Sequence, residues 1–165
     1  GYQKIESGTY PWRPGGGTRR RLEDQMPRLA ENMRHQLTMA NEDYLESIYR
    51  ITQSTGATDG IRSVDVAEQL KVSKASVNKA IATLKEAGYV EQNRYGRVQL
   101  TPKGRDYASL VWRCHRALRL FLERDLGVSH EVADEEACQM EHALSLDTQN
   151  RLIAYLDRQG ITVEE

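Results

Sequence analysis

Cys138, Glu141 and His142 combine residue types that bind metal ions with a spacing that suits a helix. Residues at i, i+3 and i+4 lie beside one another on one face of an α-helix, so these three side chains could converge on one point. A thiolate, a carboxylate and an imidazole form a ligand set for a divalent transition metal. The same pattern is also compatible with a buried cysteine that has two polar neighbours.

The apolar periodicity predicts three helices in the part of the chain that holds this pattern. The first covers about 102–126, begins with an N-cap threonine and a proline, and ends at Gly127. Ser129 is expected to cap a second helix that reaches about Leu144 and carries the metal-binding pattern. Ser145 is expected to cap a last helix that ends before Gly160.

The preceding part of the chain has the element order of a winged helix-turn-helix. Asn41 is expected to cap a helix that ends near Thr52, and Ser63 to cap a short helix over 64–70. A turn at 71–73 and a helix over 74–87 follow, with Gly88 as the C-terminal stop. Two β-prone runs around a Tyr-Gly turn then predict a β-hairpin, the wing.

The outer face of the helix over 74–87 is small, polar and basic near its N-terminus, which favours entry into a major groove. We expect Lys79 to reach guanine and Asn78 to reach adenine. Lys74 and Ala75 share this face, and the residues expected at phosphates are Ser73, Ser76, Arg94, Arg97 and Lys103. The alternative is a winged helix that binds another protein.

The charge distribution indicates two separate tasks. The net charge is −1, but residues 63–104 carry seven basic against four acidic residues, a net of +3. Residues 123–165 carry three basic against eleven acidic residues, a net of −8. The basic block suits a polyanion and the acidic block suits cations.

The composition favours a soluble globular protein of one or two domains, because 28% of the 165 residues are charged and 39% are apolar. No apolar run is long enough to cross a membrane, and no secretory leader opens the chain. The chain has two cysteines and no Cys-x-x-Cys pair, which favours a reducing, cytoplasmic location.

Four stretches together resemble the diphtheria toxin repressor (DtxR/MntR) family of metal-activated transcriptional repressors. They are Asn41–Tyr49, the end of the wing at Leu100–Gly104, Arg113–Arg116 and Glu136–Ser145. The resemblance covers about residues 38–160 and implies a mainly α fold. Together with the pattern of elements, it predicts an N-terminal extension over 1–37, a winged helix-turn-helix DNA-binding domain over 38–104, and a helical dimerisation and metal-binding domain over 105–162. In these bounds the chain resembles the short, two-domain form that is typical of the manganese regulators.

The resemblance also implies a ligand set. Asp43 and Glu46 match the acidic pair of the family's first helix, although on their own they would be interpreted as favourable first-turn charges. The metal-binding histidine of the long helix matches His115, and the trio of the following helix matches Cys138, Glu141 and His142.

This implied site is a hybrid. Aspartate at position 43 is typical of manganese-sensing members, whereas cysteine at position 138 is typical of iron-sensing members. We therefore expect Mn²⁺ as the native metal, Fe²⁺ as the alternative, and Zn²⁺ or Co²⁺ binding in vitro. Arg119 stands where some members have a glutamate ligand, so a second metal beside His115 would need Asp134, Glu135 or another group.

The implied function is a metal-activated repressor that controls metal homeostasis. It would bind a palindromic DNA operator as a homodimer in the cytoplasm, with no membrane and no small-molecule substrate. Two alternatives remain open. One is a winged-helix regulator that metal does not gate, and the other is a zinc metallohydrolase, because Cys-x-x-Glu-His is similar to the inverted zincin pattern.

Overall fold

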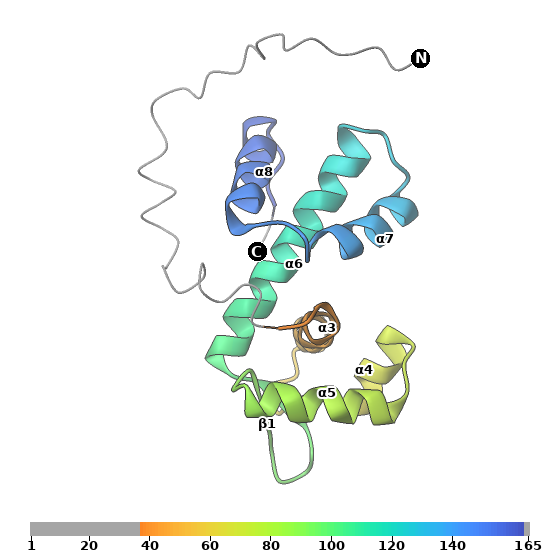
Figure 1. Cartoon of the computed structure of the whole chain (residues 1–165), viewed down its shortest axis with the longest axis vertical. Helices are drawn as coiled ribbons and strands as arrows, with labels where there is room; N and C mark the ends of the chain where they lie inside the picture. The colour runs from red at the N-terminus through yellow and green to blue at the C-terminus, as the bar shows by residue number, and fades with distance from the viewer. Residues whose placement is uncertain (1–36, 164–165) are drawn as a thin grey trace.

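The structure is a computed structural model that describes residues 37–163. These residues form six helices and one two-stranded sheet, so the predicted mainly α fold is confirmed (Figure 1). The elements are α3 (Met39–Thr55), α4 (Ser63–Leu70), α5 (Lys74–Glu86), β1 (Val90–Gln92), β2 (Val98–Leu100), α6 (Pro102–Arg124), α7 (His130–Met140) and α8 (Leu146–Arg158). The extension predicted over residues 1–37 lies, except for Leu37, outside the described residues.

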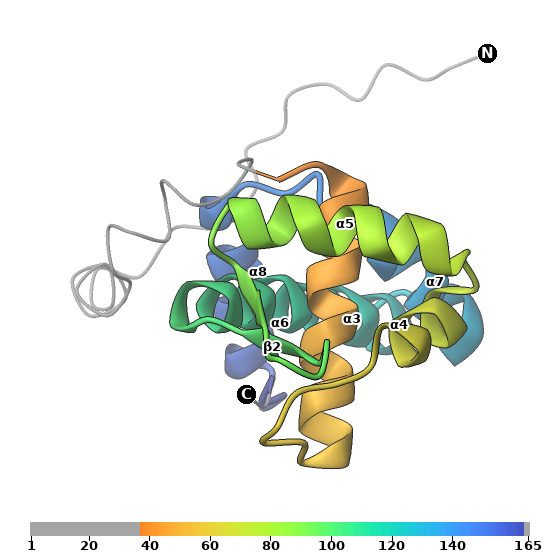
Figure 2. The same cartoon turned by 90° about the horizontal axis from the view of Figure 1, so that it is seen from below.

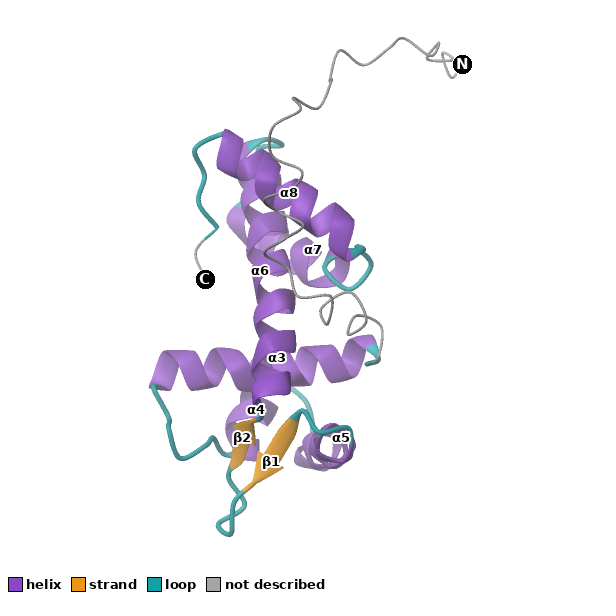
Figure 3. Cartoon of the chain, turned by 90° about the vertical axis from the view of Figure 1, so that its left-hand side faces the viewer, coloured by secondary structure: helices purple, strands orange, loops and turns teal. Residues whose placement is uncertain are grey.

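The long helix α6 is the axis of the molecule. It has 23 residues, with Thr101 as N-cap and Pro102 in the first turn, as predicted. Its first half lies beside α3 and the wing, and its second half lies beside α7 and α8 (Figures 1 and 3). One continuous helix therefore joins the two halves of the protein.

The first half is organised around one apolar core. The predicted inner face of α5 is buried and packs against α3, α4 and the wing (Figure 2). The core side chains with the lowest exposure include Leu45, Ile48, Val66, Val77, Leu84 and Val98. Because α3 contributes two of these residues, it is fixed to the helix-turn-helix by apolar packing.

The wing is a short antiparallel hairpin. Val90 pairs with Leu100 and Gln92 with Val98, and an isolated bridge from Ile61 to Val98 adds the loop before α4 to its edge. Gly104, in the first turn of α6, lies so close to the wing that a Cβ atom there would be 1.9 Å from the carbonyl oxygen of Tyr89. The absence of a side chain at position 104 lets α6 start directly against β1.

Two N-caps differ from the predictions by a few residues. The side chain of Thr38, not of Asn41, caps α3 by accepting a hydrogen bond from the backbone N–H of Asn41, so α3 begins at Met39 and continues to Thr55. Arg62 precedes α4, where its backbone N–H donates to the Asp65 carboxylate, and Ser63 is the first helical residue. The side chain that captures the free N–H groups decides each boundary.

The helix α7 ends earlier than predicted, and this changes the location of two predicted site residues. Ser129 occupies the predicted N-cap position of α7, but its side chain makes no capping hydrogen bond, and α7 ends at Met140 rather than near Leu144. Glu141 and His142 therefore lie in the turn that follows, where the backbone N–H of Ala143 donates to the carbonyl of Met140.

The predicted cap at Ser145 is confirmed, since its side chain accepts a hydrogen bond from the N–H of Thr148. A second apolar cluster, formed by Ala117, Ile153, Leu156, Ile161 and Val163, holds α8 and the segment after it against α6. Every helix within residues 37–163 is too short or too polar to cross a lipid bilayer.

Candidate metal centre and DNA-reading surface

A cluster of acidic and imidazole side chains lies where α3, α6 and the end of α7 meet (Figure 1). Asp43 and Glu46 come from α3, His115 comes from the middle of α6, and Glu141 and His142 come from the turn after α7. The structure thus brings together five of the six predicted ligands, from segments up to 99 residues apart in sequence.

The five side chains form two overlapping groups of three. Asp43, Glu141 and His142 make one group, and Glu46, His115 and Glu141 make the other; within each group the candidate ligand atoms lie within 4.8 Å of one another. Glu141 belongs to both groups and is completely buried. One carboxylate could therefore serve two adjacent cation positions.

Hydrogen bonds hold the ring nitrogens of both histidines toward this centre. Nδ1 of His115 lies 2.9 Å from Oε2 of Glu141. Nε2 of His142 lies 2.8 Å from Oδ1 of Asp43 and 3.3 Å from Oε1 of Glu141. These contacts involve the atoms that would bind a metal.

Burial disfavours the ionised form of two of the carboxylates, Glu46 and Glu141, and raises their pKa values. Desolvation and the nearby Glu141 raise the pKa of Glu46 to about 8, and the two carboxyl groups share a hydrogen bond. Desolvation likewise raises the pKa of Glu141 to about 7. Burial alone would lower the pKa of His142, but hydrogen bonds to Asp43 and Glu42 outweigh it and raise the pKa to about 10. In the absence of another cation, protons therefore neutralise the cluster.

Cys138 is the predicted ligand that the structure does not place in either group of three. The buried stripe of α7 consists of Ala133, Ala137 and then Glu141, and Cys138 lies next to this stripe with an exposed side chain. Desolvation and the charge of Glu141 raise the pKa of its thiol to about 12, so the sulfur of the metal-free protein is a neutral thiol. The ligand role of Cys138 stays a prediction.

Glu42 was not among the predicted site residues, yet it is buried beside the cluster. Its carboxylate accepts hydrogen bonds from the hydroxyl of Tyr107 and from Nδ1 of His142. The sequence does contain a signal, because Glu42 lies on the same side of α3 as Leu45, Glu46 and Tyr49, all of which are buried. An acid in an apolar stripe is unusual unless it has a partner.

The far side of His115 also has a polar partner. Nε2 of His115 lies 2.9 Å from Oδ1 of Asp134 on α7, and the same oxygen lies 3.4 Å from Nη1 of Arg119. Burial would raise the pKa of Asp134, but the hydrogen bond from His115 and the charges of His115 and Arg119 outweigh it and lower the pKa. Trp112 stacks on the imidazole with a centroid distance of 5.1 Å.

The donor set fits a divalent first-row metal. Three carboxylates and two imidazoles are hard to borderline ligands, of the kind that suits Mn²⁺ and Fe²⁺. The cluster also carries more acid than its own imidazoles can neutralise without added protons, as the raised carboxyl pKa values show. A cation could take over the neutralising role of those protons.

The predicted DNA-reading residues lie on a different, exposed surface. All eight (Ser73, Lys74, Ala75, Ser76, Asn78, Lys79, Arg94 and Arg97) are exposed on α5, its N-cap or the wing. Ser73 caps α5 through the N–H of Ser76, and Arg97 donates to the carbonyl of Gly60. Lys103, by contrast, donates to the carbonyl of Ala87 and lies over the ring of Tyr89.

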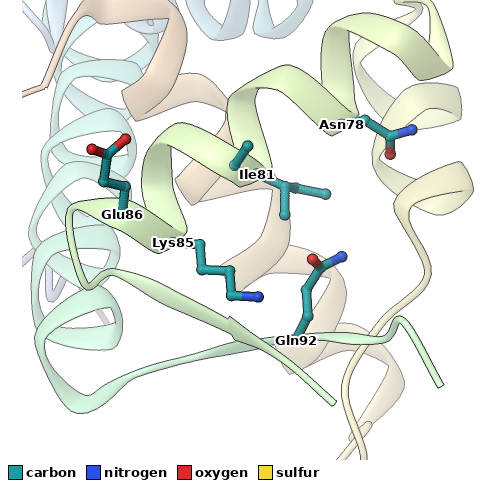
Figure 4. Close-up of a pocket in the computed structure, with 6 residues that line it drawn as sticks. Asn78, Ile81, Lys85, Glu86 and Gln92 are labelled. Atoms are coloured by element: carbon teal, nitrogen blue, oxygen red, sulfur yellow. The ribbon is translucent and has the colours of Figure 1, made fainter. Parts of the chain in front are cut away.

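A shallow hollow between α5 and β1 adjoins this surface. Figure 4 shows residues that line it, which include Asn78, Ile81, Lys85 and Glu86 of α5 and Gln92 of β1. Side chains from both α5 and the wing therefore line one hollow.

Comparison with protein families matches both halves of the chain. Residues 36–98 match the N-terminal DNA-binding domain of the iron dependent repressors, and residues 101–159 match their metal-binding and dimerisation domain. These two ranges include every helix described above and the whole hairpin except Gln99 and Leu100 of β2.

Individual relatives support the match to this family. An HTH-type transcriptional regulator of Methanocaldococcus jannaschii is 31% identical over 74% of this chain and 96% of its own length. The MntR regulator of Geobacillus kaustophilus is 37% identical over 70% of this chain and 79% of its own. The solved structure of a manganese-dependent transcriptional repressor in complex with manganese is 33% identical, with a TM-score of 0.63, over 71% of this chain and 52% of that one.

The chain spans about half the length of the diphtheria toxin repressors that it matches, 52% for that of Corynebacterium glutamicum. The matching domain pair, the structural similarity and the similarity to MntR regulators over most of their length confirm the resemblance seen in the sequence. The chain belongs to the iron dependent repressor family, the DtxR/MntR family of metal-responsive, DNA-binding transcriptional repressors.

Proposed function

We propose that the protein is a repressor that binds a palindromic operator as a homodimer when Mn²⁺ occupies the cluster between α3, α6 and α7, with Fe²⁺ as the competing native metal. The observation that carries the proposal is the mostly buried group of carboxylates and imidazoles at the junction of the two halves. Zn²⁺ and Co²⁺ are expected to bind in vitro. The protein would act in the cytoplasm and control metal homeostasis.

The proposed ligands are Asp43, Glu46, His115, Glu141 and His142, with Cys138 as a sixth ligand if its side chain turns inward. A bound divalent cation would supply positive charge that the carboxylates otherwise obtain from protons. Glu46 and Glu141 would then be fully ionised, and repulsion between them would no longer oppose the docking of α3 against α7.

The geometry offers a direct route from this cluster to DNA. Glu46 shares α3 with Leu45 and Ile48, and these two side chains pack in the same core as Val77 and Leu84 of α5. Movement of α3 relative to α7 would therefore carry the reading helix with it. In a dimer, the same movement would change the spacing of two reading helices.

The second half would form the dimer contact. Its family model is described as a metal-binding and dimerisation domain. Apolar side chains of α6 and α8 such as Leu120, Phe121, Leu152 and Tyr155 remain only partly buried around the second cluster within one chain. A twofold-symmetric pair of such surfaces would match a palindromic operator. The relatives are transcriptional regulators, so the metallohydrolase alternative gains no support from them.

The test is an operator-binding titration with the full chain. A DNA duplex is first selected from a random-sequence library in the presence of Mn²⁺, and its affinity is then measured by fluorescence anisotropy with Mn²⁺, Fe²⁺, Co²⁺, Zn²⁺ or a chelator. We expect metal to raise the affinity about 10- to 100-fold, which corresponds to a coupling of about 1–3 kcal/mol. Equal affinity after exhaustive chelation would contradict the proposal.

Lys79→Ala provides a matched control. Lys79 is exposed on α5 and is outside the acidic cluster. The variant should bind metal normally, as measured by calorimetry, but should bind DNA more weakly at every metal concentration. This pattern would separate loss of DNA contact from loss of metal activation.

A further inference from the structure

Both imidazoles of the cluster are held between two carboxylates, one inside the candidate ligand groups and one outside them. His115 directs Nδ1 to Glu141 and Nε2 to Asp134, at 2.9 Å in each case. His142 directs Nε2 to Asp43 and Nδ1 to Glu42. Neither Glu42 nor Asp134 belongs to a group of three.

The two rings are oriented in opposite ways. The nitrogen that faces the shared carboxylate Glu141 is Nδ1 in His115 but Nε2 in His142. A neutral imidazole has one N–H and one lone pair, and only the nitrogen with the lone pair can bind a metal. A carboxylate that accepts the N–H of the outer nitrogen thus leaves the lone pair on the inner one.

The two carboxylates outside the groups of three, Glu42 and Asp134, are held in place by different neighbours. Glu42 is buried, and the hydroxyl of Tyr107 donates to it. Asp134 is half-exposed, and Arg119 lies 3.4 Å from its Oδ1. In addition, Trp112 stacks on His115 with an interplanar angle of 13°, and the guanidinium of Arg50 lies 4.3 Å from the centroid of Trp112. These contacts restrict rotation of the His115 ring.

We propose that Glu42 and Asp134 are positioning residues that select the metal-binding nitrogen of each histidine, Nε2 in His142 and Nδ1 in His115. The inference rests on the proposed metal site and adds to it a fixed tautomer for each ring. Asp134 has this role because Arg119 supplies the positive charge next to it, so that Asp134 itself remains outside the ligand set.

The first test identifies the nitrogens directly. Long-range ¹H–¹⁵N NMR of histidine-labelled protein loaded with diamagnetic Zn²⁺ distinguishes a protonated from a metal-bound ring nitrogen. The chain has four histidines, so the spectrum can be assigned with single substitutions. We expect metal on Nδ1 and hydrogen on Nε2 for His115, and the reverse for His142. Metal on the opposite nitrogen of either ring would overturn the proposal.

The second test uses the variants Glu42→Gln and Asp134→Asn. An amide can donate as well as accept, so it no longer enforces one tautomer. Loss of such supporting partners typically lowers metal affinity about 10- to 100-fold, and we expect a decrease of this size in Mn²⁺ calorimetry. In the Zn²⁺ spectrum, each variant should show a mixture of tautomers for its own histidine and an unchanged signal for the other.

Glu136→Gln is the matched control, because Glu136 is an exposed acid on α7, two residues after Asp134 and outside both groups of three. It removes the same charge but should change neither the affinity nor the spectrum. If wild-type protein bound no metal, the proposed function would fail. If wild type, Glu42→Gln and Asp134→Asn bound Mn²⁺ equally well, only the positioning role would fail.

Discussion

Two neighbouring stripes of α3 are buried for opposite physical reasons. Leu45 and Ile48 lie in the apolar core of the DNA-binding half, whereas Glu42 and Glu46 lie among the carboxylates and imidazoles next to α7. Burial of the apolar stripe is favourable at any pH and without any ligand. Burial of the acidic stripe requires a proton or a cation for each excess charge.

This difference indicates which contacts of α3 are independent of metal and pH and which contacts depend on them. The attachment of α3 to α5 depends on packing alone, so the DNA-binding half should keep its fold in every metal state. The docking of α3 against α7 depends on charge neutralisation, so it should respond to metal and to pH. The predictions below test this contrast.

The largest predicted effect is a loss of folding stability in the variant Leu84→Ala, in the apolar core. Leu84 is completely buried in the core that joins α5 to α3. Removal of a buried leucine side chain typically costs about 2–5 kcal/mol, so chemical denaturation should show a loss of this size with and without Mn²⁺. A much smaller loss in the metal-loaded protein would mean that the two regions are not energetically separate.

His142→Ala should affect the other region selectively. The substitution removes a candidate ligand of one group of three and leaves the apolar core intact. We expect the metal-dependent part of operator affinity, about 1–3 kcal/mol, to disappear, while circular dichroism stays that of a folded helical protein. Glu141→Ala should behave in the same way. Normal metal-stimulated DNA binding by either variant would argue against the proposed centre.

The pH dependence of stability should distinguish the two metal states. Glu46 and Glu141 have pKa values raised from 4.5 to about 8 and about 7, so the folded protein holds more protons than the unfolded chain between these limits. His142, raised from 6.5 to about 10, acts in the same direction. These groups should make the metal-free protein less stable as pH rises from about 5 to 9.

Binding of Mn²⁺ should become stronger as pH rises, because the ligands must lose their protons before they bind the metal. The increase in melting temperature that saturating Mn²⁺ produces should therefore grow over the same pH range. Thermal melts at several pH values, with and without Mn²⁺, measure both trends. A metal-induced increase that is constant with pH would contradict the proton exchange.

Cys138→Glu should have the smallest effect on operator affinity and a clear effect on metal preference. A thiolate ligand favours softer metals, whereas a carboxylate favours Mn²⁺. We expect a higher activation by Mn²⁺ relative to Fe²⁺ in anaerobic anisotropy measurements. An unchanged activation profile would show that Cys138, which is exposed in this structure, does not bind the metal.

Local chemistry made most of the fold predictable. The reading helix follows from its serine N-cap and its inner apolar face, and α6 follows from Thr101 and Pro102. The order of helices and hairpin, together with the family resemblance, led to the same architecture. The errors at helix ends are confined to a few residues, because several side chains near an end can compete for the same free backbone groups.

The site was less predictable, because its contacts connect distant parts of the chain. Glu42 looks like an ordinary first-turn acid, and its partner His142 is 100 residues away. Cys138 fits a helical spacing with Glu141, but the buried stripe of α7 is set by Ala133 and Ala137, which pack toward α6. Periodicity gives the relative angles of side chains, and tertiary packing decides which angle faces inward.

The unbroken course of α6 has a mechanical consequence. Gly104 abuts the wing in its first turn, and His115 lies about three turns further along the same rigid rod. Inserting one residue between them would rotate the imidazole by about 100° and advance it by about 1.5 Å relative to the wing. The number of residues between Gly104 and His115 therefore sets how His115, a proposed metal ligand, is oriented relative to the wing.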